Sequence, residues 1–227
     1  MRLTRRLLHL DLYDVAVFFC HHFIDTFIGM LRSIILLLFI GTLSQTIAQS
    51  SEWKLEKQGN GIKVFTRKLE GRSVKEFKAI TTVTCSMQTL DDLLADIPGY
   101  PDWQANVASG KVLKKINENE KYLYYTTDLP WPFDDRDVVV IAKRIKMKNG
   151  SLKVTMDSRP DYIPEKEGFI RMQEITGFWL FVPKPDNKIK VIYQYYGDPA
   201  GELPASIINM LIVSGPYDTL TNLRKMK

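Results

Sequence analysis

The sequence predicts an α+β fold in which a curved antiparallel β-sheet wraps around a C-terminal α-helix. Three observations predict it. Short runs of alternating apolar and polar residues fill most of the chain after position 50, turn-forming Asn, Asp and Gly residues separate them, and one apolar segment follows Pro204 to close the chain. Connections this short join antiparallel neighbours, whereas parallel strands need a long crossover.

The first three strands are expected at residues 53–57, 61–67 and 74–83, where the side chains alternate and glycines mark the turns. A helix is expected next, at 86–96. Ser86 is a suitable N-cap, and four apolar residues at helical spacing share one face, namely Leu90, Leu93, Leu94 and Ile97. Pro98 and Gly99 end this helix, and a second short helical turn is expected at 100–103.

Six more strands are expected, at 111–116, 121–129, 137–147, 152–158, 169–182 and 188–196, each joined to the next by a short connection. The last segment, 204–227, begins with a proline and has apolar residues at helical spacing, which is typical of a helix that packs on a sheet. Pro216 cannot donate a backbone hydrogen bond, so it should kink or interrupt this helix near Ser214 and Gly215.

Size and charge describe one globular domain, expected at 50–227, with additional sequence before it. The chain has 227 residues, is 45% hydrophobic and carries a formal net charge of +5. The basic residues are dispersed, without a run of five or more, which favours a solvated lysine-rich surface over nucleic-acid binding. Weak attraction to anionic lipid is compatible with this charge but is not established by it.

Residues 1–49 are predicted to contain a signal peptide. A basic residue, Arg32, precedes an apolar stretch at 33–40, and the small residues Thr46 and Ala48 follow it. The stretch is too short to span a bilayer. We therefore expect translation to start at Met30, residues 1–29 to be a spurious extension, and the protein to be periplasmic or secreted. An uncleaved membrane anchor is the alternative.

The types of residue available argue against catalysis. His9, His21 and His22 all precede Met30, so the predicted mature chain lacks the commonest acid–base side chain. Cys85 is the only cysteine after position 49, and it can form neither an internal disulfide nor a metal site by itself. We expect no catalytic residue, no metal and no cofactor, although carboxylates and tyrosines leave an enzymatic function open.

The most informative segment runs from Trp131 to Asp137. Pro130 and Pro132 exclude a regular strand there, so Trp131 and Phe133 lie on a stiff loop and need either a core below or a ligand or membrane above. The Arg136–Asp137 pair that follows could anchor a ligand or take part in chemistry. A charge pair at the start of a strand more often ties the loop to the rest of the fold.

This segment and two others resemble the START family, the steroidogenic-acute-regulatory-related lipid-transfer domains. The others are Glu167–Arg171 and the stretch from Tyr195 through Asp198, Gly201 and Pro204 to Asn209. The resemblance covers nearly all of 53–227, apart from a weak or absent N-terminal helix. It implies a helix-grip fold and a hydrophobic tunnel that holds one lipid beneath the terminal helix and the proline-rich loop.

The resemblance also implies roles for individual residues. Trp131 and Phe133 would form a gate and a membrane contact, although both could simply cap the core. The full set of expected ligand contacts is Trp131, Phe133, Arg171, Gln173, Tyr193, Tyr195, Ile208, Asn209, Leu211 and Ile212. The expected structural set is Arg136, Asp137, Asp198, Gly201 and Pro204. Alternation leaves open which face of each strand points inward.

One position departs from the family pattern. Several relatives that handle sterols or phospholipids have an arginine six residues after the Arg of the Arg-Asp pair, and here that residue is Ala142. A mainly apolar ligand is therefore expected. The predicted function is binding, and transfer between membranes, of one hydrophobic lipid-like molecule by a monomer that contacts membranes transiently and binds no nucleic acid. The alternatives are a helix-grip cyclase or aromatase-like enzyme and a ligand-sensing module.

Overall fold

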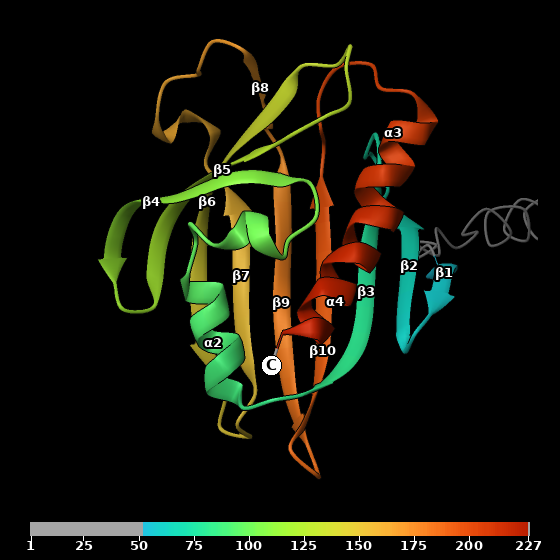
Figure 1. Ribbon diagram of the computed structural model, residues 1–227. Coiled ribbons are helices and arrows are strands. Elements are labelled where there is room, and N and C mark those ends of the chain that lie inside the picture. The colour runs from blue at the N-terminus through green and yellow to red at the C-terminus, as the bar shows by residue number, and fades with distance from the viewer. Residues whose placement is uncertain (1–51, 227) are drawn as a thin grey trace, which may run out of the picture. The chain divides into compact units, whose positions relative to one another are not determined.

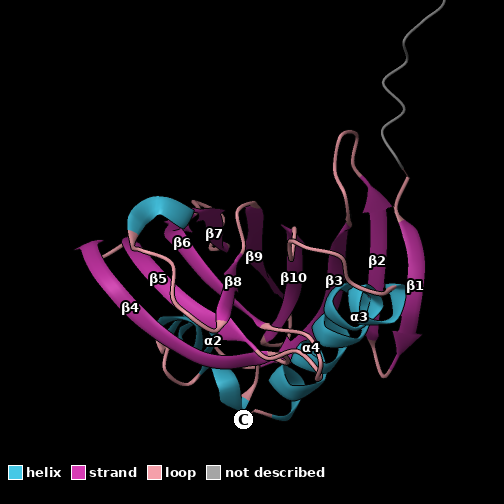
Figure 2. Ribbon diagram, turned by 90° about the horizontal axis from the view of Figure 1, so that it is seen from above, coloured by secondary structure: helices cyan, strands magenta, loops and turns pink. Residues whose placement is uncertain are grey.

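A curved ten-stranded sheet with helices on its concave side makes up the part of the chain that the computed structural model describes, residues 52–226 (Figures 1 and 2). The strands are β1 (Lys54–Gly59), β2 (Ile62–Lys68), β3 (Lys75–Thr84), β4 (Val107–Asn117), β5 (Glu120–Thr127), β6 (Asp135–Lys146), β7 (Leu152–Ser158), β8 (Phe169–Arg171), β9 (Ile175–Lys184) and β10 (Lys188–Gly197). The helix-grip fold predicted from the sequence is confirmed.

The strand order is β1-β2-β3-β10-β9-β7-β6-β5-β4, and β8 pairs with β6. Most sequence neighbours pair as antiparallel hairpins, as expected. The antiparallel pairing of β3 with β10 joins an early strand of the chain to the last strand and completes the surface on which the terminal helix lies. Because this contact links segments about a hundred residues apart, local alternation could not predict it.

The single strand expected at 169–182 is wrong. The chain instead forms two strands separated by residues 172–174, and β8 runs parallel to β6 through the pairs Asp135–Phe169 and Asp137–Arg171. The first three residues are held beside β6, where Arg171 pairs with Asp137, and the chain must then cross to reach β10. The break in the strand is the physical consequence of these two different partners.

The connection between β3 and β4 contains α2 (Met87–Ala95) and the short 3-10 helix η1 (Tyr100–Asp102), as expected. Ser86 caps α2 by accepting a hydrogen bond from the Thr89 N–H at 3.0 Å. Leu90 and Leu94 are buried on the predicted face. Asp91 is also buried there, because its carboxylate binds the Arg144 guanidinium of β6.

The terminal helix is interrupted where the sequence predicted. It consists of α3 (Ala205–Asn209), a π-helical turn η3 (Met210–Ser214) and α4 (Gly215–Lys225). Pro216 has no N–H to continue an α-helical ladder, and the Gly215 N–H reaches back five residues to the Met210 carbonyl. Leu220 and Leu223 of α4 are buried against the sheet, so α4 is the firmly packed half of the helix.

The predicted signal peptide, the start at Met30 and the alternative membrane anchor all fall in residues 1–49, which lie outside the described part of the chain. Within residues 52–226, none of the helices combines the length and apolar character needed to cross a membrane.

Candidate functional site

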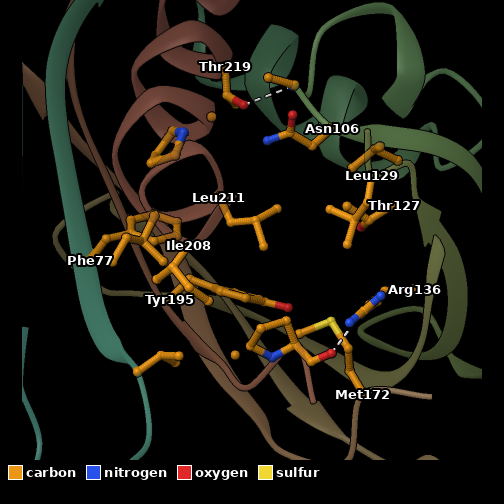
Figure 3. Close-up of a pocket in the computed structure, with 18 of the residues that line it drawn as sticks. Phe77, Asn106, Thr127, Leu129, Arg136, Met172, Tyr195, Ile208, Leu211 and Thr219 are labelled. Atoms are coloured by element: carbon orange, nitrogen blue, oxygen red, sulfur yellow. Dashed lines mark hydrogen bonds between the residues drawn. The ribbon is translucent and has the colours of Figure 1, made fainter. Parts of the chain in front are cut away.

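A cavity lies between the terminal helix and the inner face of the sheet (Figure 3). It contains about 810 Å³ of empty space, including the part open to solvent. Half of its lining residues are apolar side chains from the sheet, the rim and the helix, namely Val74, Phe77, Val107, Leu129, Met172, Pro199, Ile208, Leu211, Ile212 and Pro216. A concave site of this composition suits a hydrophobic molecule.

Strand alternation explains which residues line the cavity. Tyr193 and Tyr195 of β10 and Tyr125 of β5 stand on the same side of the sheet as the buried Phe77 of β3. The sequence left open which set of alternating residues faces inward. In β10 the odd-numbered set does, so the residues on the other face of the strand, such as Gln194, point away from the helix.

The polar groups at the cavity wall are mostly uncharged. The hydroxyl groups of Tyr125 and Tyr195 lie 3.2 Å apart and share a hydrogen bond. Burial raises the pKa of Tyr125 to about 12 and that of Tyr195 well above its ordinary value, so both phenols stay protonated at neutral pH. They can therefore offer a hydroxyl donor or acceptor to a ligand but no charge.

Arg136 is the one side chain with a permanent charge at the cavity wall among the described residues, and each of its three nitrogens donates to a backbone carbonyl. Its Nε donates to the Pro199 carbonyl at 2.7 Å and one terminal nitrogen donates to the Ala200 carbonyl at 3.0 Å. Another terminal nitrogen donates to the carbonyl of Asp134. Arg136 thus ties the connection after β10 to the loop before β6, and we do not assign it to a ligand.

Asp137 does not pair with Arg136; its partner is Arg171. The two side chains are each 1% exposed and form a double hydrogen bond at 2.7 and 2.9 Å. Arg171 also donates to the carbonyls of Ile163 and Pro164 in the loop after β7. Three loops, 128–134, 159–168 and 198–204, are thus fastened at the beginning of β6 by two buried guanidinium groups.

These three loops lie together at the end of the sheet where β6 begins (Figure 1), and two of them contribute Leu129 and Pro199 to the cavity lining; we call the three the rim loops. They carry seven carboxylates, Asp128, Asp134, Asp161, Glu165, Glu167, Asp198 and Glu202, but only two basic side chains, Arg159 and Lys166. Trp131 lies at the tip of the first loop and is 92% exposed. An indole so accessible on a stiff loop fits an interfacial contact better than a cap on the core.

The expected ligand contacts divide into two groups. Five of them line the cavity: Tyr193, Tyr195, Ile208, Leu211 and Ile212. The other five do not. Trp131, Gln173 and Asn209 are exposed, Phe133 is half-buried in the first rim loop, and Arg171 belongs to the buried ion pair. The structure therefore moves Arg171 from ligand contact to fastening of the rim.

The other structural residues hold the turn that leads into the terminal helix. Asp198 accepts hydrogen bonds from the Ala200 N–H at 2.9 Å and from the Ser73 hydroxyl. Gly201 has a positive φ of 68°, which favours glycine, and Pro204 precedes the first residue of α3.

Several cavity residues were missed from the sequence. Phe77 and Thr127 would have been found once the inward face of each strand was known, whereas Met172 lies in the break between β8 and β9, where strand alternation does not apply. Asn106 gave no signal. It has a positive φ of 66° before β4, and its side chain lies so close to Gly215 that a Cβ there would be 2.4 Å from the amide nitrogen. Gly215 is therefore needed for the helix to approach this wall.

No metal site accompanies the cavity in the described residues, since no three His, Cys, Asp or Glu side chains there are grouped to hold an ion. Ala142, the residue that departs from the family pattern, is buried and lines a separate hollow near α2. The position at which the family resemblance led us to look for an arginine is thus apolar and lies outside the cavity.

Comparison with known proteins agrees with the fold. The START domain profile matches residues 42–226. An uncharacterized protein of Pseudomonas aeruginosa is 31% identical over 197 residues, which cover 86% of this chain and 96% of that protein. The phosphatidylcholine transfer protein of Mus musculus is 22% identical over 189 residues, 81% of this chain and 87% of its own length.

Solved structures show the same fold. The STAR-related lipid transfer protein of Xanthomonas axonopodis superposes with a TM-score of 0.70 at 32% identity, covering 76% of this chain and 97% of that chain. Human StAR-related lipid transfer protein 5 superposes with a TM-score of 0.67 at 17% identity, covering 88% and 96%, which shows the shared fold. The chain therefore belongs to the START domain family of lipid-transfer proteins.

Proposed function

We propose that the protein binds one uncharged, hydrophobic lipid-like molecule in the cavity beneath its terminal helix and transfers it between membranes. The observation that carries this proposal is the cavity lining, which combines apolar side chains with protonated tyrosines and an arginine whose three nitrogens each donate to a backbone carbonyl. Affinity would come from burial of apolar surface, about 25 cal/mol per Å² before the costs of binding are subtracted.

The activities for which two relatives are named support this proposal. A protein that transfers phosphatidylcholine and a bacterial lipid-transfer protein both align over most of this chain. The engagement of Arg136 by backbone carbonyls favours a ligand without a charged group over a phospholipid. Export to a periplasm, or secretion, remains part of the proposal and rests on the sequence of residues 30–49 alone.

The proposed function involves no catalysis. A hydrolytic or proton-transfer reaction would need an acid or base in the cavity with a pKa near neutral. Among residues 52–226, no carboxylate and no histidine lines the cavity, and burial raises the pKa of Tyr125 away from neutrality. Trp131, exposed on the rim, supports membrane contact during loading and release.

Two experiments test the proposal. Native mass spectrometry of the purified protein, followed by organic extraction, should reveal one hydrophobic molecule per chain that carries no charged group. Recovery of only unliganded protein, even after incubation with a lipid extract, would contradict it. Transfer between vesicles should slow at least severalfold in Trp131→Ala and recover in Trp131→Phe. Leu55→Ala, on the exposed strand β1, is the matched control and should transfer normally.

A further inference from the structure

The inner face of the sheet carries a second hollow, which the proposed function does not use. It contains about 940 Å³ of empty space, including its open part, and lies between α2 and the ends of the strands farther from the rim loops. Its apolar lining includes Leu94, Ile97, Leu123, Ala142, Met156 and Trp179. At its edge the Arg144 guanidinium binds Asp91 of α2 and Asn119.

Two stacked rings separate this hollow from the ligand cavity. Tyr193 lines the cavity and Trp179 lines the second hollow. Their ring centroids are 3.9 Å apart and their planes differ by 4°. Trp103 also contacts Trp179, with a centroid distance of 5.6 Å and an angle of 56° between the ring planes. The partition between two spaces is thus about as thick as one pair of aromatic rings.

The sheet register holds this partition in place. Tyr193 and Trp179 are directly paired across β10 and β9, so their side chains rise from adjacent points on the same face. Phe77 supports Tyr193 edge-on at 4.9 Å, and Trp103 and Trp179 are only 2% and 1% exposed. The rings are therefore fixed by their neighbours and cannot turn aside without displacing the core.

We propose that the Trp179–Tyr193 stack determines the length of the ligand. This inference rests on the proposed function. The hydrophobic part of the ligand would end against Tyr193, which forms the cavity side of the stack. The ligand class is then a compact neutral lipid, and the second hollow is space that the stack keeps a longer chain from entering.

The test uses monoacylglycerols of increasing chain length, with affinity measured by displacement of a fluorescent apolar dye. Affinity should rise about fourfold for each methylene that still enters the cavity and should then level off. Trp179→Leu removes the ring of the partition that faces the second hollow. In this variant the affinity should continue to rise over several further methylenes. If Trp179→Leu does not fold, Tyr193→Leu opens the same partition from the cavity side and should give the same extension.

Ala142→Phe supplies the matched control, because Ala142 lines the second hollow and not the cavity. Alone it should leave the chain length of the plateau unchanged, and in the Trp179→Leu background it should restore the original plateau. An unchanged plateau in both partition variants, or a shorter one in Ala142→Phe alone, would overturn the role of the stack. Absence of any monoacylglycerol binding by the unaltered protein would overturn the proposed function itself, and this inference with it.

Discussion

Single residues at the rim show how hydrogen-bond geometry, rather than charge, decides what a buried arginine does. Arg171 faces one carboxylate and several backbone carbonyls, and Arg136 faces carbonyls alone. A guanidinium carries five N–H donors in a fixed plane, so it can hold several chain segments together. Arg171 donates to Asp137 and to the loop after β7, and Arg136 donates from each of its three nitrogens to loop carbonyls. Tyrosine hydroxyls are therefore the main polar groups that the cavity can offer to a ligand.

Replacing Arg171 should destabilise the protein strongly. Arg171→Met leaves the Asp137 carboxylate buried without a partner, and such a loss costs about 3–5 kcal/mol of unfolding free energy. Chemical denaturation monitored by tryptophan fluorescence would measure it. The control is Lys54→Met, which removes an ion pair to Glu56 whose lysine is 72% exposed, and should cost less than about 1 kcal/mol. Equal losses in the two variants would contradict this account of the rim.

Alkaline pH should weaken the fold through Tyr125. Burial raises the pKa of this phenol to about 12 in the folded protein, whereas an exposed tyrosine titrates near about 10. The folded state therefore keeps a proton that the unfolded state loses. This contribution to stability is complete below about pH 10 and disappears as the pH rises toward 12.

Denaturation measured across that range tests the prediction. Tyr125→Phe removes one such group and should make stability fall less steeply with pH. An identical slope for Tyr125→Phe and the unaltered protein would count against the prediction.

Five of the ten residues that the sequence predicted as ligand contacts line the cavity. For those on a strand, the physical reason is that side chains alternate between the two faces of the sheet. Tyr193 and Tyr195 are two apart on one strand, so one correct choice of face places both. Arg171 could not be placed this way. Its partner Asp137 lies 34 residues away, and only the parallel pairing of β8 with β6 brings the two together.

At the level of the elements, hydrogen-bond signals within a few residues were the most reliable. The cap at Ser86, the end of α2 and the interruption near Pro216 follow from local donors and acceptors, and the structure contains all three. The strand expected at 169–182 failed because two distant partners divide it. Its composition suits a strand throughout, so nothing within the segment marks the break.

The cap of α2 provides a test at this scale. Ser86→Ala removes the acceptor for the Thr89 N–H and should cost about 1 kcal/mol of unfolding free energy. Gln88→Ala serves as the control, because it removes only an exposed side-chain bond to Asp92 and should cost less than about 0.5 kcal/mol. A Ser86→Ala effect no larger than that of Gln88→Ala would show that the cap is not what holds the start of α2.

Across the described molecule, charge is distributed unevenly. The rim loops are acidic, whereas Lys63, Lys78, Lys153 and Lys190 lie on the outer face of the sheet, opposite the helices. Partial burial, together with the positive charge of the nearby Arg67, lowers the pKa of Lys78 on this face. The surface with the exposed Trp131 and the surface with the lysines are therefore different parts of the molecule.

This separation predicts how vesicle composition affects docking. If Trp131 leads the contact, binding to zwitterionic vesicles should weaken at low salt when anionic lipid is added, because the rim carboxylates are repelled. Salt should restore it, since the Debye length falls to about 10 Å at 0.1 M. Vesicle flotation of a Glu165→Gln, Glu167→Gln variant should show less sensitivity to anionic lipid than Glu118→Gln, a control in the β4–β5 turn. Stronger binding to anionic vesicles would instead assign docking to the lysine face.

The π-helical turn has a consequence for how the cavity can open. The five residues of α3 include none that is buried and lack a side-chain cap, whereas α4 buries Leu220 and Leu223. Local unfolding would therefore free α3, with Ile208 at the cavity wall, while the core under α4 stays intact. Native-state hydrogen exchange should find faster exchange in 205–209 than in 219–223, and uniform protection across both would rule this out. A ligand could then enter through a transition confined to one end of a single helix, with a free-energy cost well below that of global unfolding.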